Sequence, residues 1–213
     1  MAEPMTELDV VVGSLITTTP QEDREAYEEE REWLQDVQDL LREEGIEVDL
    51  LLQPGTEVWE GGIESFADLY QLQRLAAHLE RGNDVQEILS DQNLEDEEFD
   101  ELLDAIAYNE TQTRFPHLIQ HQGAGGYYLP VDFAEPISFG YGEDDEEEDG
   151  ELMEDDETTS FGSSVALLRE LTDVEALLQQ ANVPQQIGAR SALQVLRTAA
   201  EQSMSSGLPI ILW

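Results

Sequence analysis

Residues 8–52 read LDVVVGSLITTTPQEDREAYEEEREWLQDVQDLLREEGIEVDLLL, and this stretch decides the predicted fold. Residues 8–16 form a short apolar run rich in valine, which is typical of a buried strand. Residues 46–52 alternate apolar and acidic side chains, which indicates a second strand. Between them, apolar residues recur at helical spacing with acids on the opposite face, and Gly45 ends the pattern. The stretch therefore predicts an N-terminal β-α-β unit with a right-handed crossover.

The rest of the chain alternates between helical and extended patterns. Residues 65–107 fit three short helices with polar joints, and a turn-rich stretch with interrupting prolines follows at residues 114–142. Residues 189–204 show the cleanest helical period, and residues 208–213 predict a closing strand. Because a strand near each terminus suggests that both join one sheet, we expect a single α+β domain over residues 1–213. We expect the middle of this domain to be helical. We also expect the C-terminal helix and strand to join the same mixed sheet as the N-terminal strands.

The charge of the chain excludes several functions. The sequence holds 50 acidic and 9 basic residues, all arginine, for a net charge of −41, and it has no cysteine. Neutralising phosphates requires clustered lysine and arginine, so we expect no binding of nucleic acid or of an anionic membrane. The absence of cysteine removes disulfides and thiol catalysis. No segment approaches the roughly 18 apolar residues of a membrane helix, and acids near Met1 stand where a secretory signal carries positive charge. We therefore expect a cytoplasmic protein.

The densest acidic segment is EDDEEEDGELMEDDE at residues 143–157, which holds 12 acids and no base. Like charges at this density cannot pack, so the segment predicts a flexible acidic insert over residues 143–160. Without these 12 acids the chain keeps a net charge of −29, so the acidity is not confined to the insert.

Patterns that would carry catalysis or bind a metal are weak. His117 and His121 are four residues apart, but zinc needs a further ligand, and the glutamate of the HExxH pattern is missing. Asp132 and Glu135 could act as acid and base only if a pocket raised the pKa of one of them. Residues 123–126 are glycine-rich but lack the lysine and hydroxyl residue of a phosphate-binding loop. We therefore expect no cofactor and no catalytic machinery.

Aromatic side chains among acids are better candidates for contact with a partner. Trp59 is predicted to lie in a glycine-flanked loop with Glu57 and Glu60, and such a setting suits stacking of a partner's arginine, although core packing is the alternative. These three residues and the first seven acids of the insert are the predicted partner-binding residues: Glu57, Trp59, Glu60, Glu143, Asp144, Asp145, Glu146, Glu147, Glu148 and Asp149.

Two explanations for the missing lysine compete. An acidic surface can be an adaptation to concentrated salt, which screens its self-repulsion. In that case the protein is a housekeeping enzyme with a pocket near His117, His121, Asp132 and Glu135.

Alternatively, the acidic surface steers a basic protein toward this one. Immunity proteins, antitoxins and inhibitors that mimic a DNA duplex use this principle, although no motif ties the chain to one of them. We favour a non-catalytic acidic module that binds a basic nucleic-acid-binding or toxin protein, as an inhibitor or immunity-type factor. An even cover of acids would indicate solvation, and a contiguous stripe would indicate recognition.

Overall fold

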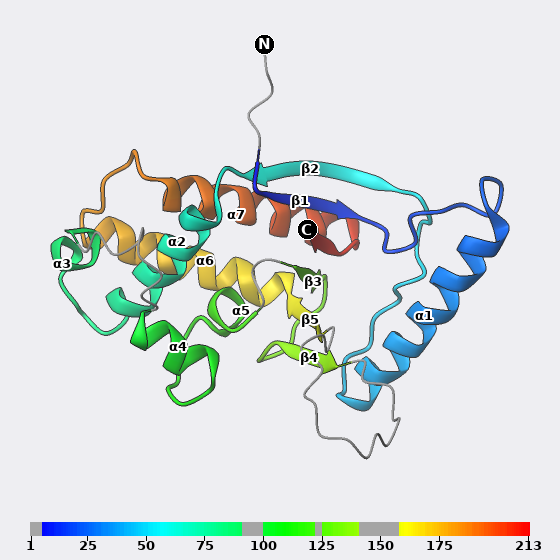
Figure 1. The fold of residues 1–213 in the computed structure, drawn as a ribbon, viewed down its shortest axis with the longest axis horizontal. Helices are drawn as coiled ribbons and strands as arrows, with labels where there is room; N and C mark the ends of the chain where they lie inside the picture. The colour runs from blue at the N-terminus through cyan, green and yellow to red at the C-terminus, as the bar shows by residue number, and fades with distance from the viewer. Residues whose placement is uncertain (1–5, 91–99, 122–124, 141–157) are drawn as a thin grey trace, which may run out of the picture.

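The computed structural model describes residues 6–90, 100–121, 125–140 and 158–213 (Figure 1). In these ranges the chain forms six strands and seven helices, and none of the helices is both long and apolar enough to cross a membrane. In chain order the elements are β1 (Leu8–Gly13), α1 (Arg24–Glu43), β2 (Glu57–Ile63), α2 (Phe66–Leu79), α3 (Val85–Ser90), α4 (Glu101–Ala107), α5 (Pro116–Ile119), β3 (Gly126–Leu129), β4 (Ile137–Gly140), β5 (Thr158–Ser163), α6 (Ser164–Gln180), α7 (Gly188–Ser206) and β6 (Ile210–Leu212).

All six strands belong to one mixed sheet in the order β2-β1-β6-β3-β5-β4. Only β3 and β5 run parallel to each other, and the other neighbouring strands are antiparallel. The two terminal strands pair directly, with Val11 opposite Ile211. The structure thus confirms the predicted α+β fold with one mixed sheet, in which the C-terminal strand β6 is central.

Helices cover the two faces of the sheet unequally. On one face, Val10 and Val12 of β1 pack into the larger hydrophobic cluster with apolar residues of α2, α6 and α7, which Figure 1 shows together. On the other face, Phe161 of β5 and Ile211 of β6 pack with residues of α1, which Figure 1 shows apart from those three helices. Helix α1 is therefore held on its own face by a separate, smaller cluster.

The predicted β-α-β unit is wrong in its second strand. Residues 46–52 form no strand, and the strand that follows α1 is β2, which pairs antiparallel with β1 rather than through a parallel crossover. The apolar alternation has another cause, because Ile46 and Leu50 are buried beneath α1. The side-chain Oε1 of Gln38 accepts the backbone N–H of Leu50 at 2.5 Å, where a neighbouring strand would otherwise accept it.

The last three residues of the predicted acidic insert belong to a strand. Residues 158–160, which the prediction assigns to the insert, begin β5, where Ser160 is buried and pairs with Ser138 of β4. Residues 143–157 lie outside the described part of the chain.

We predict that Leu34→Ala lowers the free energy of unfolding by about 2–5 kcal/mol, because Leu34 is fully buried where α1 meets the sheet. Leu40→Ala, on the same helix but only half-buried, is the matched control and should cost less. Urea unfolding measures both losses, and hydrogen exchange should show faster exchange of α1 amides in Leu34→Ala. Equal losses for the two substitutions would show that α1 does not dock through Leu34.

Candidate functional site

Negative charge is distributed unevenly along the described chain. Residues 6–64 carry 18 acids and 3 arginines, a net charge of −15, whereas residues 158–213 carry 4 acids and 3 arginines, a net charge of −1. The first range contains β1, α1 and β2, and the second contains β5, α6, α7 and β6. Among the described residues, the negative charge is therefore concentrated in the N-terminal elements.

The largest group of exposed acids lies along α1, and we call it the α1 ridge. Its members are spaced three or four residues apart, so they share one face of the helix, and all of them are exposed. At 1.5 Å rise per residue the ridge is about 27 Å long. It comprises Glu25, Glu28, Glu29, Glu32, Asp36, Asp39 and Glu43.

The opposite face of α1 fixes the ridge in place. Leu34, Val37 and Leu41 are fully buried on that face. The carboxylate of Asp23 caps the helix by accepting the backbone N–H groups of Glu25 and Ala26. Because the helix is anchored along its length and capped, its acids are held as an ordered row rather than as a loose tail.

Two arginines form ion pairs with ridge acids, one near each end of α1, whereas the exposed Arg31 between them forms none among the described residues. Arg24 pairs with Glu28 at 2.8 Å, and Arg42 pairs with Asp39. Within the described ranges, the other five ridge acids take part in no ion pair. These five keep an exposed carboxylate for contact with an external cation.

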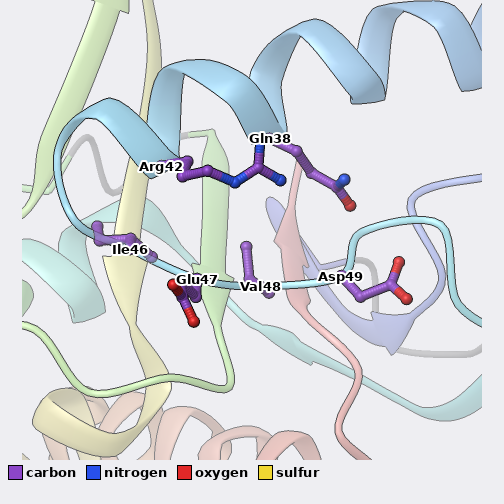
Figure 2. A pocket seen from close by; sticks show the side chains of 6 residues that line it. All are labelled: Gln38, Arg42, Ile46, Glu47, Val48 and Asp49. Carbon is purple, nitrogen blue, oxygen red and sulfur yellow. The ribbon is translucent and has the colours of Figure 1, made fainter.

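The acidic surface continues past the C-terminal end of α1. A hollow of about 410 Å³ lies between the helix and residues 46–49, and Figure 2 shows Arg42 and Gln38 reaching from α1 over this segment. The carboxylate of Glu47 points away from α1 in the same view, and both Glu47 and Asp49 are exposed. Among the described residues, the hollow therefore brings together no group of acids that could hold a ligand, and its rim carries two further exposed acids.

The predicted contact residues Glu57, Trp59 and Glu60 lie on the edge strand β2 rather than in a loop. Successive residues of a strand point to opposite faces. Trp59 is half-buried, stands opposite Val12 and packs against the larger cluster, whereas the exposed Glu60 stands opposite Val11. The structure therefore does not place Trp59 and Glu60 on one face. The other seven predicted contacts, Glu143 to Asp149, lie outside the described residues.

The rings of the two candidate metal ligands, His117 and His121, contact the backbone. Both ring nitrogens of the fully buried His117 bond to the backbone: Nδ1 accepts the N–H of Ser163 at 3.0 Å, and Nε2 donates to the carbonyl of Phe133 at 3.0 Å. The Nε2 of His121 lies 3.1 Å from the carbonyl of Tyr127. In the part of the chain that the structure describes, no three potential ligands gather around a point where a metal could bind. His117 therefore keeps no ring nitrogen free to bind a metal.

The pocket expected in the enzyme alternative is not assembled from its four residues. Asp132 is exposed and bound by both terminal nitrogens of Arg169, at 2.7 and 2.8 Å. Glu135 lines a hollow of about 550 Å³ with Arg114, and neither buried histidine lines it, although His117 lies close enough to Asp132 for their charges to interact. The four side chains do not converge as a catalytic group requires.

One buried carboxylate, Glu170, is missing from the residues predicted from the sequence. It accepts the backbone N–H groups of His117 at 3.1 Å and Leu118 at 2.9 Å, and so holds the short helix α5 against α6. Burial raises the pKa of Glu170 to about 8, while these two hydrogen bonds act in the opposite direction. Its position on the apolar stripe of α6, beside Leu171, is the signal that could have revealed its burial.

We predict that His117 stays neutral down to about pH 4, because burial lowers its pKa from 6.5 to about 4. In the unfolded chain His117 gains a proton below pH 6.5. Its contribution to the free energy of unfolding is therefore complete above pH 6.5, and about 3 kcal/mol is lost as the pH falls to 4. The imidazole resonances of His117 in an NMR titration measure the midpoint, and a midpoint near 6.5 would contradict the buried, hydrogen-bonded geometry.

Comparison with known proteins places the chain in a sequence family. A sequence model of a family described as "Putative DNA-mimic protein" matches residues 6–212. Neither the curated proteins nor the solved structures contain a significant match. Because the family model covers nearly the whole chain, the chain belongs to the family of putative DNA-mimic proteins.

Proposed function

We propose that this protein is a non-catalytic module that binds the DNA-binding face of a basic protein, with the α1 ridge as its principal contact. The match to the DNA-mimic family supports this class of partner. Occupation of that face would exclude DNA, so the protein would act as an inhibitor or immunity-type factor.

The observation that carries the proposal is the linear density of charge on α1. The ridge sets seven carboxylates along about 27 Å of helix. One strand of B-DNA carries a phosphate for each ~3.4 Å along the axis, or about eight over the same length. Two of the seven ridge acids pair with arginines, so a protein surface built to contact one phosphate strand would meet five unpaired carboxylates on α1 over this length.

The uneven distribution of acids favours recognition over adaptation to salt. A surface selected for hydration in concentrated salt gains from acids on every exposed element. Residues 158–213, however, carry a net charge of only −1, against −15 for residues 6–64. A basic partner that docks on one side requires charge on that side alone and is steered to it from solution.

The capture of a partner from the source cells tests the proposal. The immobilised protein should retain basic DNA-binding proteins at about 0.1 M salt, where the Debye length is about 10 Å. Duplex DNA should release them, whereas sodium sulfate of equal ionic strength should release less, because DNA competes for the same protein face. Retained proteins that duplex DNA fails to displace would overturn the proposal.

A charge-matched pair of variants tests the role of α1. The ridge variant neutralises the five ridge acids that lack an ion pair: Glu25→Gln, Glu29→Gln, Glu32→Gln, Asp36→Asn and Glu43→Gln. The control variant neutralises five exposed acids elsewhere: Glu87→Gln, Glu101→Gln, Glu110→Gln, Glu135→Gln and Asp173→Asn. We predict that the ridge variant slows association with the captured protein by about tenfold or more at low salt. The control should change the rate much less, and equal effects would show that only total charge matters.

A further inference from the structure

One corner of the sheet is left open on the face that α1 occupies. Val11 and Ile211 stand opposite each other on this face, in β1 and β6. Beside them Trp213 is 57 % exposed, and Val58 of the edge strand β2 is 44 % exposed. An aromatic ring and a valine side chain thus remain in contact with water next to the most acidic part of the described chain.

A hollow of about 120 Å³ lies in this corner. The apolar side chains of Val11 and Ile211 and the ring of Trp213 line it together with Glu57, and polar residues of two turns complete it. No arginine lines it. Pockets for cofactors measure about 300–1,000 Å³, so this one has room for a single side chain rather than for a cofactor.

The backbone explains why the hollow is open and where its aromatic wall stands. Trp213 is fixed by two hydrogen bonds with the backbone of Asp9, of 2.8 and 3.2 Å. At Gly13 a Cβ atom would lie 2.9 Å from the carbonyl oxygen of Thr56. Gly55 has a φ of +70°, a left-handed backbone conformation that residues with a side chain rarely adopt. These two glycines allow the chain to turn tightly at the rim without filling the space.

The chemistry of the lining selects a long cationic side chain. Val11 and Ile211 suit an aliphatic stem, the Trp213 ring suits a planar cation stacked on its face, and the Glu57 carboxylate suits a donor at the tip. Asp9 and Glu60 extend the same face with further negative charge. An arginine side chain supplies the aliphatic stem, the planar cation and the hydrogen-bond donor. The ammonium group of lysine lacks the planar surface for stacking.

We propose that this hollow receives an arginine side chain of the basic partner. The inference rests on the proposed function, and it adds a specific anchor beside the unspecific attraction of the α1 ridge. A second copy of the chain is the less suitable occupant, because two copies of net charge −41 repel each other. Arginine in the hollow would let the protein distinguish partners of equal charge, which a row of carboxylates alone does poorly.

Two peptides of equal length and charge test the proposal without a DNA-binding protein. One contains six arginines and the other six lysines, and calorimetry at about 0.1 M salt measures both dissociation constants. We expect the arginine peptide to bind about two- to fivefold more tightly, and the indole N–H resonance of Trp213 to shift on binding. Trp213→Ala should remove this preference and leave the lysine peptide's affinity unchanged, while Trp213→Phe should keep part of it.

Matched controls separate this site from general attraction. Tyr108→Ala removes an aromatic ring that is 78 % exposed on another element, and it should leave the preference intact. Glu57→Gln should weaken binding of the arginine peptide more than Glu110→Gln does. A preference that survives Trp213→Ala, or a concentration-dependent dimer that Trp213→Ala abolishes, would overturn the proposal. If the preference holds but duplex DNA displaces no captured protein, the proposed function fails and the arginine site does not.

Discussion

The docking of α1 on its own face of the sheet is the contact on which the acidic surface depends. Burial of Leu34, Val37 and Leu41 contributes about 1.5–3 kcal/mol for each side chain. The ridge contains seven like-charged neighbours at helical spacing, each costing about 0.2–0.5 kcal/mol. Burial therefore outweighs repulsion, and the sheet holds in helical form a row of acids that would disfavour the same helix in isolation.

This arrangement divides the molecule by role. The face with α2, α6 and α7 holds the larger hydrophobic cluster, and its C-terminal elements are almost neutral. The face with α1 holds the smaller cluster and presents the ridge, the open corner at Trp213 and the acids of β2. Stability thus depends mainly on one side of the sheet, and the proposed recognition depends on the other. A change of charge on the ridge should therefore leave the larger cluster undisturbed.

Much of this could be predicted from the sequence, and the failures have identifiable causes. The terminal strands and α1 follow from hydrophobic periodicity, which reports burial. For the same reason residues 46–52 were misread as a strand, since burial under α1 gives the same alternation as pairing in a sheet. His117 was considered only as a weak metal ligand or a pocket residue, and Glu170 was not singled out, yet both are buried and bonded to the backbone through contacts between residues far apart in the sequence. The hollow at Trp213 combines β1, β2 and β6, so no local pattern records it.

The central claim is that the ridge acids act as one concentrated electrostatic unit, and its most direct test is the salt dependence of stability. Urea unfolding of the wild type, the ridge variant and the control variant is compared at about 10 mM and about 1 M KCl, where the Debye length is about 30 Å and 3 Å. We predict that the ridge variant is more stable than both others at low salt and that its advantage disappears at high salt. Equal stabilisation by the two variants at low salt would contradict it, because the charge would then act as an even surface layer.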